Sequence, residues 1–371
     1  MPPSTAHTAT TFEVIPRHPD AARWLPRANA YSLAMAYVKG AIDVQGDLIE
    51  AVRHHLASAK RGWQTRLVDA VCRWTPWRLL QGRPGRAAAA RNIRFHYDRS
   101  NDFYRLFLDS QLVYSCAYFR REDDTLDQAQ INKLDHICRK LRLQRGDRFL
   151  DIGCGWGALI LHAARRFGAA ATGCTLSTRQ YEYATERVRI EGASNVSIRE
   201  EDYRDVDGQF DKIASVGMFE HVGLAQLRTY FRKAYELLAP NGLFLNHGIT
   251  RPASVRADSQ SMFIAHKVFP GSQLVQLDQV IHTAEGVGFE VLDVENLYKH
   301  YARTARMWVE RLTANREECL KAALEETWRT WRLYLAGCSL AFEEGGMGLH
   351  QVLFAKRGAG AAPATRDDIY R

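Results

Sequence analysis

Three glycines within seven residues, in the segment from Asp151 to Gly157 (DIGCGWG), constrain this chain more than any other feature. The apolar run before them, Arg148 to Gly153, has the length and composition of a buried strand, and the residues that follow favour a helix. Glycines at such a strand-to-helix turn allow a sharp bend and leave room for a ligand beside the backbone. Alternatively, they serve only close packing of the strand against the helix. We expect a ligand site at the end of this strand.

Strand and helix patterns alternate along the chain beyond about residue 90. This alternation predicts an α/β fold, in which a mostly parallel sheet is covered by helices on both faces. A mostly helical region, 301–344, separates the last two strands. The seven predicted strands are Arg148 to Gly153, Ala170 to Leu176, Asn195 to Arg199, Phe210 to Val216, Leu243 to His247, Phe289 to Val294 and Leu349 to Ala355.

A segment rich in helix breakers, QGRPGRAAAA at 81–90, divides the chain. We place a domain boundary near residue 90, with a small accessory domain over residues 1–90 and the main domain over residues 91–371. Within the accessory domain, residues 34–56 have the pattern of a strand followed by a helix.

The formal net charge of +8 is concentrated near the N-terminus. Residues 1–100 hold 15 Lys and Arg against 7 Asp and Glu, so the remainder of the chain is close to neutral. Between residues 60 and 94, nine cations accompany only one acidic residue, Asp69, and alternate with Trp63, Trp74 and Trp77. Tryptophan among cations favours an anionic membrane surface over a nucleic-acid groove. The cations are Lys60, Arg61, Arg66, Arg73, Arg78, Arg83, Arg86, Arg91 and Arg94.

Several protein classes lack support in the sequence. No stretch approaches the roughly 18 consecutive apolar residues of a membrane-spanning helix, and the first eleven residues lack the pattern of a secretion signal. The seven cysteines form no C-x-x-C pair and have no histidines at zinc spacing. We therefore expect a cytoplasmic protein without a metal site, associated peripherally with the inner face of the membrane.

The glycine loop also indicates which ligand it binds. A dinucleotide-binding loop would have the pattern G-x-G-x-x-G, whereas D-x-G-x-G-x-G resembles the S-adenosylmethionine loop of Rossmann-like class I methyltransferases. This resemblance implies that the amino-acid end of the cofactor lies against Gly153 and Gly155, with Asp151 and Gly157 completing the loop.

The next two strands end in residues suited to the rest of this cofactor. The second strand ends without an acidic residue, so Thr175 and Gln180 would offer a hydroxyl and an amide to the ribose. After the third strand, Asp202 can accept a hydrogen bond from the adenine amino group, and Tyr203 can stack on the base. Taken alone, residues 201–203 fit an exposed loop equally well.

Several separated blocks resemble the signature stretches of the cyclopropane fatty acid synthases and mycolic acid cyclopropane synthases, over about residues 90 to 356. They follow one another in the order that the family has. The blocks are FHYD at 95–98, NDFY at 101–104, VYSCAYF at 113–119, SVGMFEHVG at 215–223, NHGI at 246–249, HYART at 300–304 and WRLYLA at 331–336.

The resemblance implies both a fold and a reaction. The fold is a Rossmann-like class I methyltransferase with a mostly parallel seven-stranded sheet, helical lipid-binding insertions and a small N-terminal accessory domain. The reaction transfers the methyl carbon of S-adenosylmethionine to the cis double bond of an unsaturated phospholipid acyl chain and closes a cyclopropane ring. Because an isolated alkene is a weak nucleophile, such an enzyme must offer it a methyl sulfonium in a dry pocket.

In this family the base for ring closure is a bound bicarbonate ion. The residues that match its ligands are Cys116, Glu220, His247, Ile249 through its backbone, and Tyr301. The matching cofactor contacts are Tyr114, Ser115, Gly153, Gly155, Thr175, Leu176, Gln180 and Tyr203. Each residue taken singly also fits a structural role, such as a buried thiol, a core histidine or an aromatic on an amphipathic helix. The functional assignment rests on their occurrence together, and Trp156 is assigned to packing.

The family also implies partners. Its acyl chain lies in a tunnel covered by insertions, for which residues 262–277 and the helices beyond Tyr301 are the candidates. The N-terminal part resembles the accessory domain of the bacterial phospholipid-modifying members, which are homodimers.

Other functions remain open at this point. A related methyltransferase could leave a methyl or methylene chain, and another could act on a soluble small molecule. An RNA methyltransferase would use the basic region for nucleic acid, although no RNA-binding motif is present, and we predict no nucleic-acid partner. A non-catalytic cofactor sensor would leave the bicarbonate-site residues unexplained.

Overall fold

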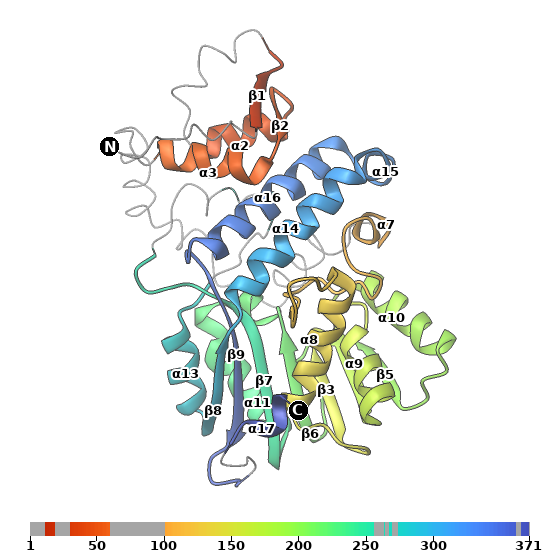
Figure 1. Ribbon diagram of the computed structural model, residues 1–371. Helices are drawn as coiled ribbons and strands as arrows, with labels where there is room; N and C mark the ends of the chain where they lie inside the picture. Colours follow the sequence, from red (N-terminus) through yellow and green to blue (C-terminus); the bar gives the residue numbers. More distant parts are fainter. Residues whose placement is uncertain are drawn as a thin grey trace.

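The computed structural model describes residues 12–18, 30–59, 101–255, 263, 267–268, 274–360 and 365–370. Its centre is a seven-stranded sheet in the order β5-β4-β3-β6-β7-β9-β8 (Figure 1). Strands β3 to β7 are parallel, and β9 runs antiparallel to both β7 and β8. The strands are β3 (Arg148–Ile152), β4 (Ala170–Thr175), β5 (Val196–Glu200), β6 (Phe210–Val216), β7 (Leu238–Thr250), β8 (Phe289–Asn296) and β9 (Gly348–Lys356).

The seven predicted strands are therefore confirmed, and the largest difference in length is in β7. Strand β7 begins five residues before the predicted Leu243, since Leu238 already pairs with Phe210 of β6. Pro240, Asn241 and Gly242 lie within this strand, and the β6–β7 pairing shifts register between Phe210 and Lys212.

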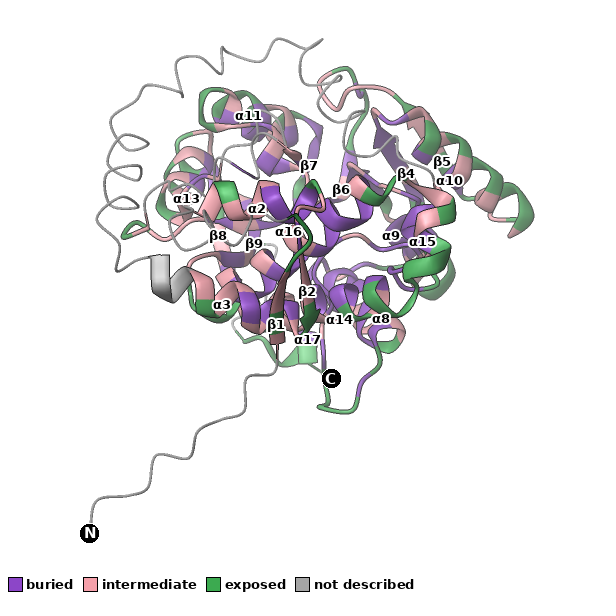
Figure 2. Ribbon diagram, turned by 90° about the horizontal axis from the view of Figure 1, so that it is seen from above, coloured by how far each residue is buried: buried purple, intermediate pink, exposed green. Residues whose placement is uncertain are grey.

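Two hydrophobic clusters cover the two faces of the sheet. Successive strand residues point to opposite faces, so Phe149 joins one cluster and Leu150 the other. The first cluster packs against α8 (Leu126–Lys140) and α9 (Ala158–His162), with α10 (Thr178–Ile190) beside them. The second packs against α11 (Leu227–Leu237) and α13 (Leu277–Glu285). Figure 2 shows the buried residues gathered in the strands and on the inward sides of these helices.

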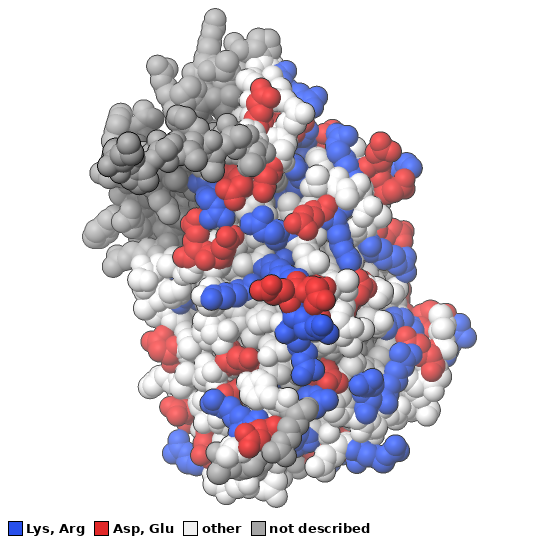
Figure 3. Space-filling model, viewed as in Figure 1, with Lys and Arg blue, Asp and Glu red and all other residues white. Residues whose placement is uncertain are grey.

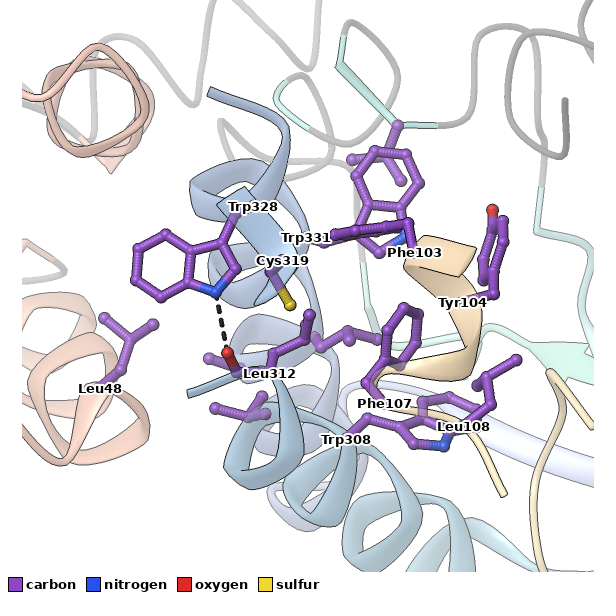
Figure 4. Packing of buried hydrophobic residues seen from close by; sticks show 14 of the residues in the cluster. Leu48, Phe103, Tyr104, Phe107, Leu108, Trp308, Leu312, Cys319, Trp328 and Trp331 are labelled. Carbon is purple, nitrogen blue, oxygen red and sulfur yellow. Dashed lines mark hydrogen bonds between the residues drawn. The ribbon is translucent and has the colours of Figure 1, made fainter. Parts of the chain in front are cut away.

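Two long helices lie over the carboxyl-terminal edge of the parallel strands. They are α14 (Tyr298–Ala314) and α16 (Glu325–Glu343), joined by α15 (Arg316–Ala322), and they confirm the predicted helical region. An aromatic cluster fills the space between these helices and α7 (Asn101–Arg105), with Trp308, Trp331, Phe103 and Phe107 in contact (Figure 4).

An N-terminal unit packs on the outer side of α16 (Figure 1). It comprises a two-stranded antiparallel sheet and two helices: β1 (Phe12–Pro16), α2 (Ala30–Val38), β2 (Ile42–Gly46) and α3 (Leu48–Ala59). The strand and the helix predicted for residues 34–56 are present as β2 and α3. The end of helix α2 precedes them in this segment. The buried guanidinium of Arg329 joins the unit to α16 through the carbonyls of Tyr37 and Ile42 and the carboxylate of Asp43. The proposed boundary near residue 90 and the nine cations of residues 60–94 lie outside the described residues.

Candidate active site

A pocket opens at the carboxyl ends of strands β3, β4, β5 and β6, where ligands bind in open α/β sheets. Segments far apart in the sequence meet there because parallel strands end at one edge of the sheet. The residues predicted to contact the cofactor that line this pocket are Tyr114, Ser115, Asp151, Gly153, Gly155, Thr175, Leu176, Gln180, Asp202 and Tyr203.

The three loop glycines have different tasks. Gly153, Gly155 and Gly157 all have positive φ, a conformation that glycine adopts without strain. Any Cβ at Gly153 would come within 2.9 Å of Met218, so the loop and the segment after β6 could not approach as they do. Gly157 lies outside the pocket lining and precedes α9, where a Cβ would meet Ala184 of α10 at 3.2 Å. Its role in the structure is helix packing.

A short hydrogen-bonded set follows β4. The Thr175 hydroxyl donates to Gln180 Oε1 at 2.9 Å and accepts from the Ser177 backbone N–H at 3.2 Å, while the Ser177 side chain caps α10. These bonds fix both side chains at the pocket wall. Since Gln180 Oε1 is already engaged, its amide nitrogen is the part of the side chain suited to a ribose oxygen.

The carboxylate of Asp202 is held by a neighbouring guanidinium. Arg204 donates from Nε to Oδ1 at 2.8 Å and from a terminal nitrogen to Oδ2 at 2.5 Å. This fork fixes the direction of the carboxylate at the pocket wall. Tyr203 contacts Tyr230 edge-on, with ring centroids 5.7 Å apart.

Glu220 lies buried in a short helical turn after β6, between Met218 and His221 of the pocket lining. Its Oε1 accepts a hydrogen bond from the Ile249 backbone N–H at 2.7 Å. Its Oε2 is buried without a hydrogen-bond partner among the described residues. Burial raises the pKa of Glu220 to about 7, against the lowering effect of the Ile249 hydrogen bond. This carboxyl is poised between its charged and neutral forms near neutral pH.

His247 lies buried on β7, two residues before Ile249. Its Nδ1 is 3.1 Å from Gln351 Nε2 on β9, which assigns Nδ1 as the acceptor and places the ring proton on Nε2. That Nε2 is buried and, within the described part of the chain, has no partner. Burial holds the pKa of His247 well below its usual value, so the ring is neutral. It can donate one hydrogen bond from Nε2.

Cys116, Ile249 and Tyr301 share one cluster of packed side chains. The Cys116 thiol is fully buried beside the carbonyls of Ala117 and Leu297, and burial raises its pKa well above the usual value. It is therefore a thiol and not a nucleophilic thiolate. Tyr301, on α14, stacks on Phe342 of α16 with centroids 4.5 Å apart. The structure thus groups Cys116, Ile249 and Tyr301, attaches Glu220 to Ile249 and pairs His247 with Gln351.

The pocket also includes residues that the sequence did not single out. Met218 and His221 belong to the block at 215–223 and could have been included on that ground. Trp156, assigned to packing, is buried and donates to Asn101 at 2.9 Å, but it lines the pocket as well. Lys133, on α8, lines the pocket too. The only sequence signal for Lys133 is a lysine on the apolar side of an amphipathic helix.

Two further observations concern only the described residues. Among the residues that the structure describes, no group of three or more His, Cys, Asp or Glu side chains is arranged to hold a metal ion. None of the described helices combines the length and apolarity that crossing a bilayer requires.

Known proteins similar to this chain share both sequence and fold. Residues 85–352 match the family described as mycolic acid cyclopropane synthetase. A probable fatty acid methyltransferase of Pseudomonas putida is 42% identical over 96% of this chain and 91% of its own length. Cyclopropane mycolic acid synthase 1 of Mycobacterium tuberculosis is 36% identical over 70% of this chain and 95% of its own length.

Solved structures agree with these relatives. The cyclopropane synthase MmaA2 from Mycobacterium tuberculosis superposes with a TM-score of 0.70 at 34% identity, covering 72% of this chain and 98% of that one. The mycolic acid cyclopropane synthase CmaA1, complexed with SAH and CTAB, gives 0.69 at 35% identity, with the same two coverages. Coclaurine N-methyltransferase, at 24% identity and a TM-score of 0.71, shares the fold. This protein therefore belongs to the mycolic acid cyclopropane synthetase family of S-adenosylmethionine-dependent methyltransferases.

Proposed function

We propose that this enzyme transfers the methyl carbon of S-adenosylmethionine to the cis double bond of an unsaturated phospholipid acyl chain and closes a cyclopropane ring. The observation that carries the proposal is a pair of buried polar atoms without partners in the described structure, Glu220 Oε2 and His247 Nε2. Glu220 is flanked by pocket residues, and the Ile249 N–H that holds its carboxylate lies two residues after His247 on β7; from this we infer that both atoms face one site beside the cofactor pocket.

The aromatic residues between the pocket and α14 suit an alkene substrate. Tyr114 of the pocket lining packs against Trp308 at 5.2 Å between ring centroids, and Trp308 contacts Tyr301 at 6.0 Å. This row of aromatic rings, of which Trp308 is fully buried, would exclude water from the sulfonium and present π-faces, which attract a developing carbocation. This surface would favour methyl transfer to a carbon nucleophile that water would otherwise outcompete.

The residues present fit a bound bicarbonate. Glu220 Oε2 can accept a hydrogen bond, and the neutral His247 ring can donate one from Nε2, so an ion with both kinds of group would satisfy both buried atoms. We propose that Cys116, Glu220, His247, Ile249 and Tyr301 form the site of this ion, with the backbone of Ile249 acting through Glu220. Bicarbonate bound there would supply the base for removal of the proton. The Ile249 N–H already donates to Glu220, which positions that carboxylate.

Membrane association is proposed for the N-terminal part. On the face shown in Figure 3, acidic and basic side chains of the described residues intermingle and form no basic field. The proposed contact therefore depends on the nine cations of residues 60–94, each contributing on the order of 1 kcal/mol at an anionic leaflet. The Pseudomonas putida relative aligns with 96% of the chain, including N-terminal residues, which supports a task shared with that protein. We also propose a homodimer, to be checked by sedimentation.

One alternative has specific support. Because the Pseudomonas putida relative is described as a probable fatty acid methyltransferase, the product could be a methylated chain and the substrate a fatty acid. Such an enzyme would share the cofactor pocket and differ in which proton the cation loses.

Mass spectrometry of the lipid product tests the proposal. Pure protein is incubated with S-adenosylmethionine, bicarbonate and anionic vesicles of a monounsaturated phospholipid, and the acyl chains are analysed as methyl esters. A gain of one CH₂ group with a ring in the NMR spectrum supports cyclopropanation. The same gain with a retained double bond supports the alternative. No gain, in protein that binds S-adenosylhomocysteine, contradicts a lipid substrate, and neutral vesicles show whether the anionic surface matters.

A further inference from the structure

Lys133 is a buried cation on the wall of the cofactor pocket. It lies on α8 with only 2% of its surface exposed, and it lines the pocket together with Ser115 and Asp151. Its Nζ donates to Ser115 Oγ at 3.1 Å. No carboxylate in the described ranges lies within 4.0 Å of it.

This arrangement leaves the ammonium group incomplete. A buried ammonium is costly unless it is paired and hydrogen-bonded, and a hydroxyl satisfies only one of its three N–H donors. Burial lowers the pKa of Lys133 to about 8, although Asp109 and Asp151 act in the opposite direction from a distance. Since the remaining donors lie at a ligand pocket, an anionic group of the ligand would complete them.

Asp151 provides the opposite charge in the lining of the same pocket. It ends β3 with 3% of its surface exposed, and its Oδ1 is buried without a hydrogen-bond partner in the part of the chain that is described. Burial raises the pKa of Asp151 to about 7, and the attraction of Lys133 opposes that rise. The lining of the pocket therefore has a cationic and an anionic group that attract each other, and each has polar atoms without enough partners.

We propose that Lys133 binds the α-carboxylate at the amino-acid end of the cofactor and that Asp151 binds its α-ammonium group. A zwitterion is the ligand chemistry that completes both side chains at once. Ser115, held by Lys133, lies at the same end of the pocket. This inference rests on the proposed S-adenosylmethionine site but not on the lipid substrate or on bicarbonate.

Calorimetric titration with three ligands tests the assignment without any lipid. S-adenosylhomocysteine has both groups, its decarboxylated form retains only the amine, and 5′-methylthioadenosine lacks both. In Lys133→Met, we expect affinity for S-adenosylhomocysteine to fall by about 10- to 100-fold, the range for a lost charge-assisted hydrogen bond. The other two ligands should bind nearly as they do to the unaltered protein.

Asp151→Asn is the matched control. This substitution should lower the affinity for S-adenosylhomocysteine and for its decarboxylated form. The affinity for 5′-methylthioadenosine should remain nearly unchanged. Equal weakening of all three ligands in Lys133→Met would assign Lys133 a purely structural role and overturn the inference.

The unaltered protein gives a further test that needs no variant. If it binds S-adenosylhomocysteine no more tightly than the decarboxylated form, the inference is wrong even if Lys133→Met does not fold. The two proposals can fail separately. If the three ligands bind with the expected order of affinities but no lipid is turned over, the proposed function is wrong and the role of Lys133 in cofactor binding stands.

Discussion

Helix α8 has two buried lysines seven residues apart, and their surroundings differ. Two helical turns separate Lys133 from Lys140, so both lie on nearly the same side of the helix. Lys140 is fully buried, and its Nζ forms ion pairs with Asp293 at 3.0 Å and Glu295 at 2.6 Å, both on β8. Lys133 has the Ser115 hydroxyl, and no described carboxylate lies within 4.0 Å.

The partners of Lys140 have further ion pairs of their own, although Lys140 Nζ and Asp293 Oδ2 form no hydrogen bond of good geometry within the described residues. Glu295 also pairs with His136 at 2.7 Å, and Asp293 pairs with Arg366 at 2.9 Å. Burial alone would raise the pKa of Glu295, but the hydrogen bond of His136 and the charge of Lys140 outweigh burial and lower it to about 2. The difference teaches that a buried charge neutralised by ion pairs within the protein serves the fold, whereas a buried charge without an ion pair at a pocket is available to a ligand. Glu220, with its unpartnered Oε2, belongs to the second kind.

The largest expected effect is on turnover, and it distinguishes Glu220, which has an unpartnered oxygen, from Glu295, which has ion pairs. Glu220→Gln should lower turnover by about 10²- to 10⁴-fold, the usual contribution of a group that takes part in proton transfer. Its affinity for S-adenosylhomocysteine should stay within about twofold, because the cofactor contacts are elsewhere. Steady-state turnover and calorimetry measure the two quantities. In contrast, Glu295→Gln should reduce stability and leave turnover of the folded fraction largely unchanged. Unchanged turnover in Glu220→Gln would remove Glu220 from the mechanism.

Substitution of the two lysines should affect the stability of the protein differently. Lys140→Met leaves the buried carboxylate of Asp293 and the half-buried carboxylate of Glu295 without their central cation, and it should lower the free energy of unfolding by about 3–5 kcal/mol. Lys133→Met removes a buried charge that has no ion pair in the described structure. This substitution should change the free energy of unfolding by less than about 1 kcal/mol. Urea unfolding of the ligand-free proteins measures both values. Equal destabilisation by the two substitutions would contradict the distinction drawn between them.

A double substitution sharpens the account of the Lys140 network. The single substitution Lys140→Met leaves the Glu295 carboxylate without this cation. In the double variant Lys140→Met/Glu295→Gln, both charges of the pair are removed together. The combined loss of stability should therefore be smaller than the sum of the two single losses by about 1–3 kcal/mol. Simple additivity in urea unfolding would show that Lys140 and Glu295 do not interact.

The smallest expected effect is a pH dependence of stability. The pKa of Glu295 is about 2 in the folded protein against a usual value of 4.5, so the unfolded chain binds the proton more readily. The contribution of Glu295 is complete above about pH 4.5 and is lost as the pH falls toward 2. Between pH 5 and pH 3 the unaltered protein should lose about 1–2 kcal/mol more than Glu295→Gln. The same slope in both proteins would show that Glu295 is not responsible.

The sequence was sufficient for features that depend on local pattern. The apolar runs located the seven strands. The position of the glycine loop directly after a strand located the pocket, because the parallel strands all end at one edge of the sheet. It failed where tertiary packing decides. Lys133 is an ordinary helix residue in sequence, and its burial depends on Ser115 and Asp151, which lie elsewhere in the chain. Gly157 fits the loop pattern, and only the structure shows that a Cβ there would meet Ala184 of α10. The partner of His247, Gln351, comes from a strand 104 residues away.

Isotopic labelling tests the central claim most directly. The enzyme is given S-adenosylmethionine with a trideuterated methyl group and vesicles of a monounsaturated phospholipid, and the acyl product is examined by mass spectrometry and NMR. Cyclopropanation, with the proton lost from the transferred carbon, predicts a ring CD₂ group that retains two of the three deuterons. A product that retains all three as a CD₃ group would show that the proton came from the acyl chain and would contradict ring formation at this site.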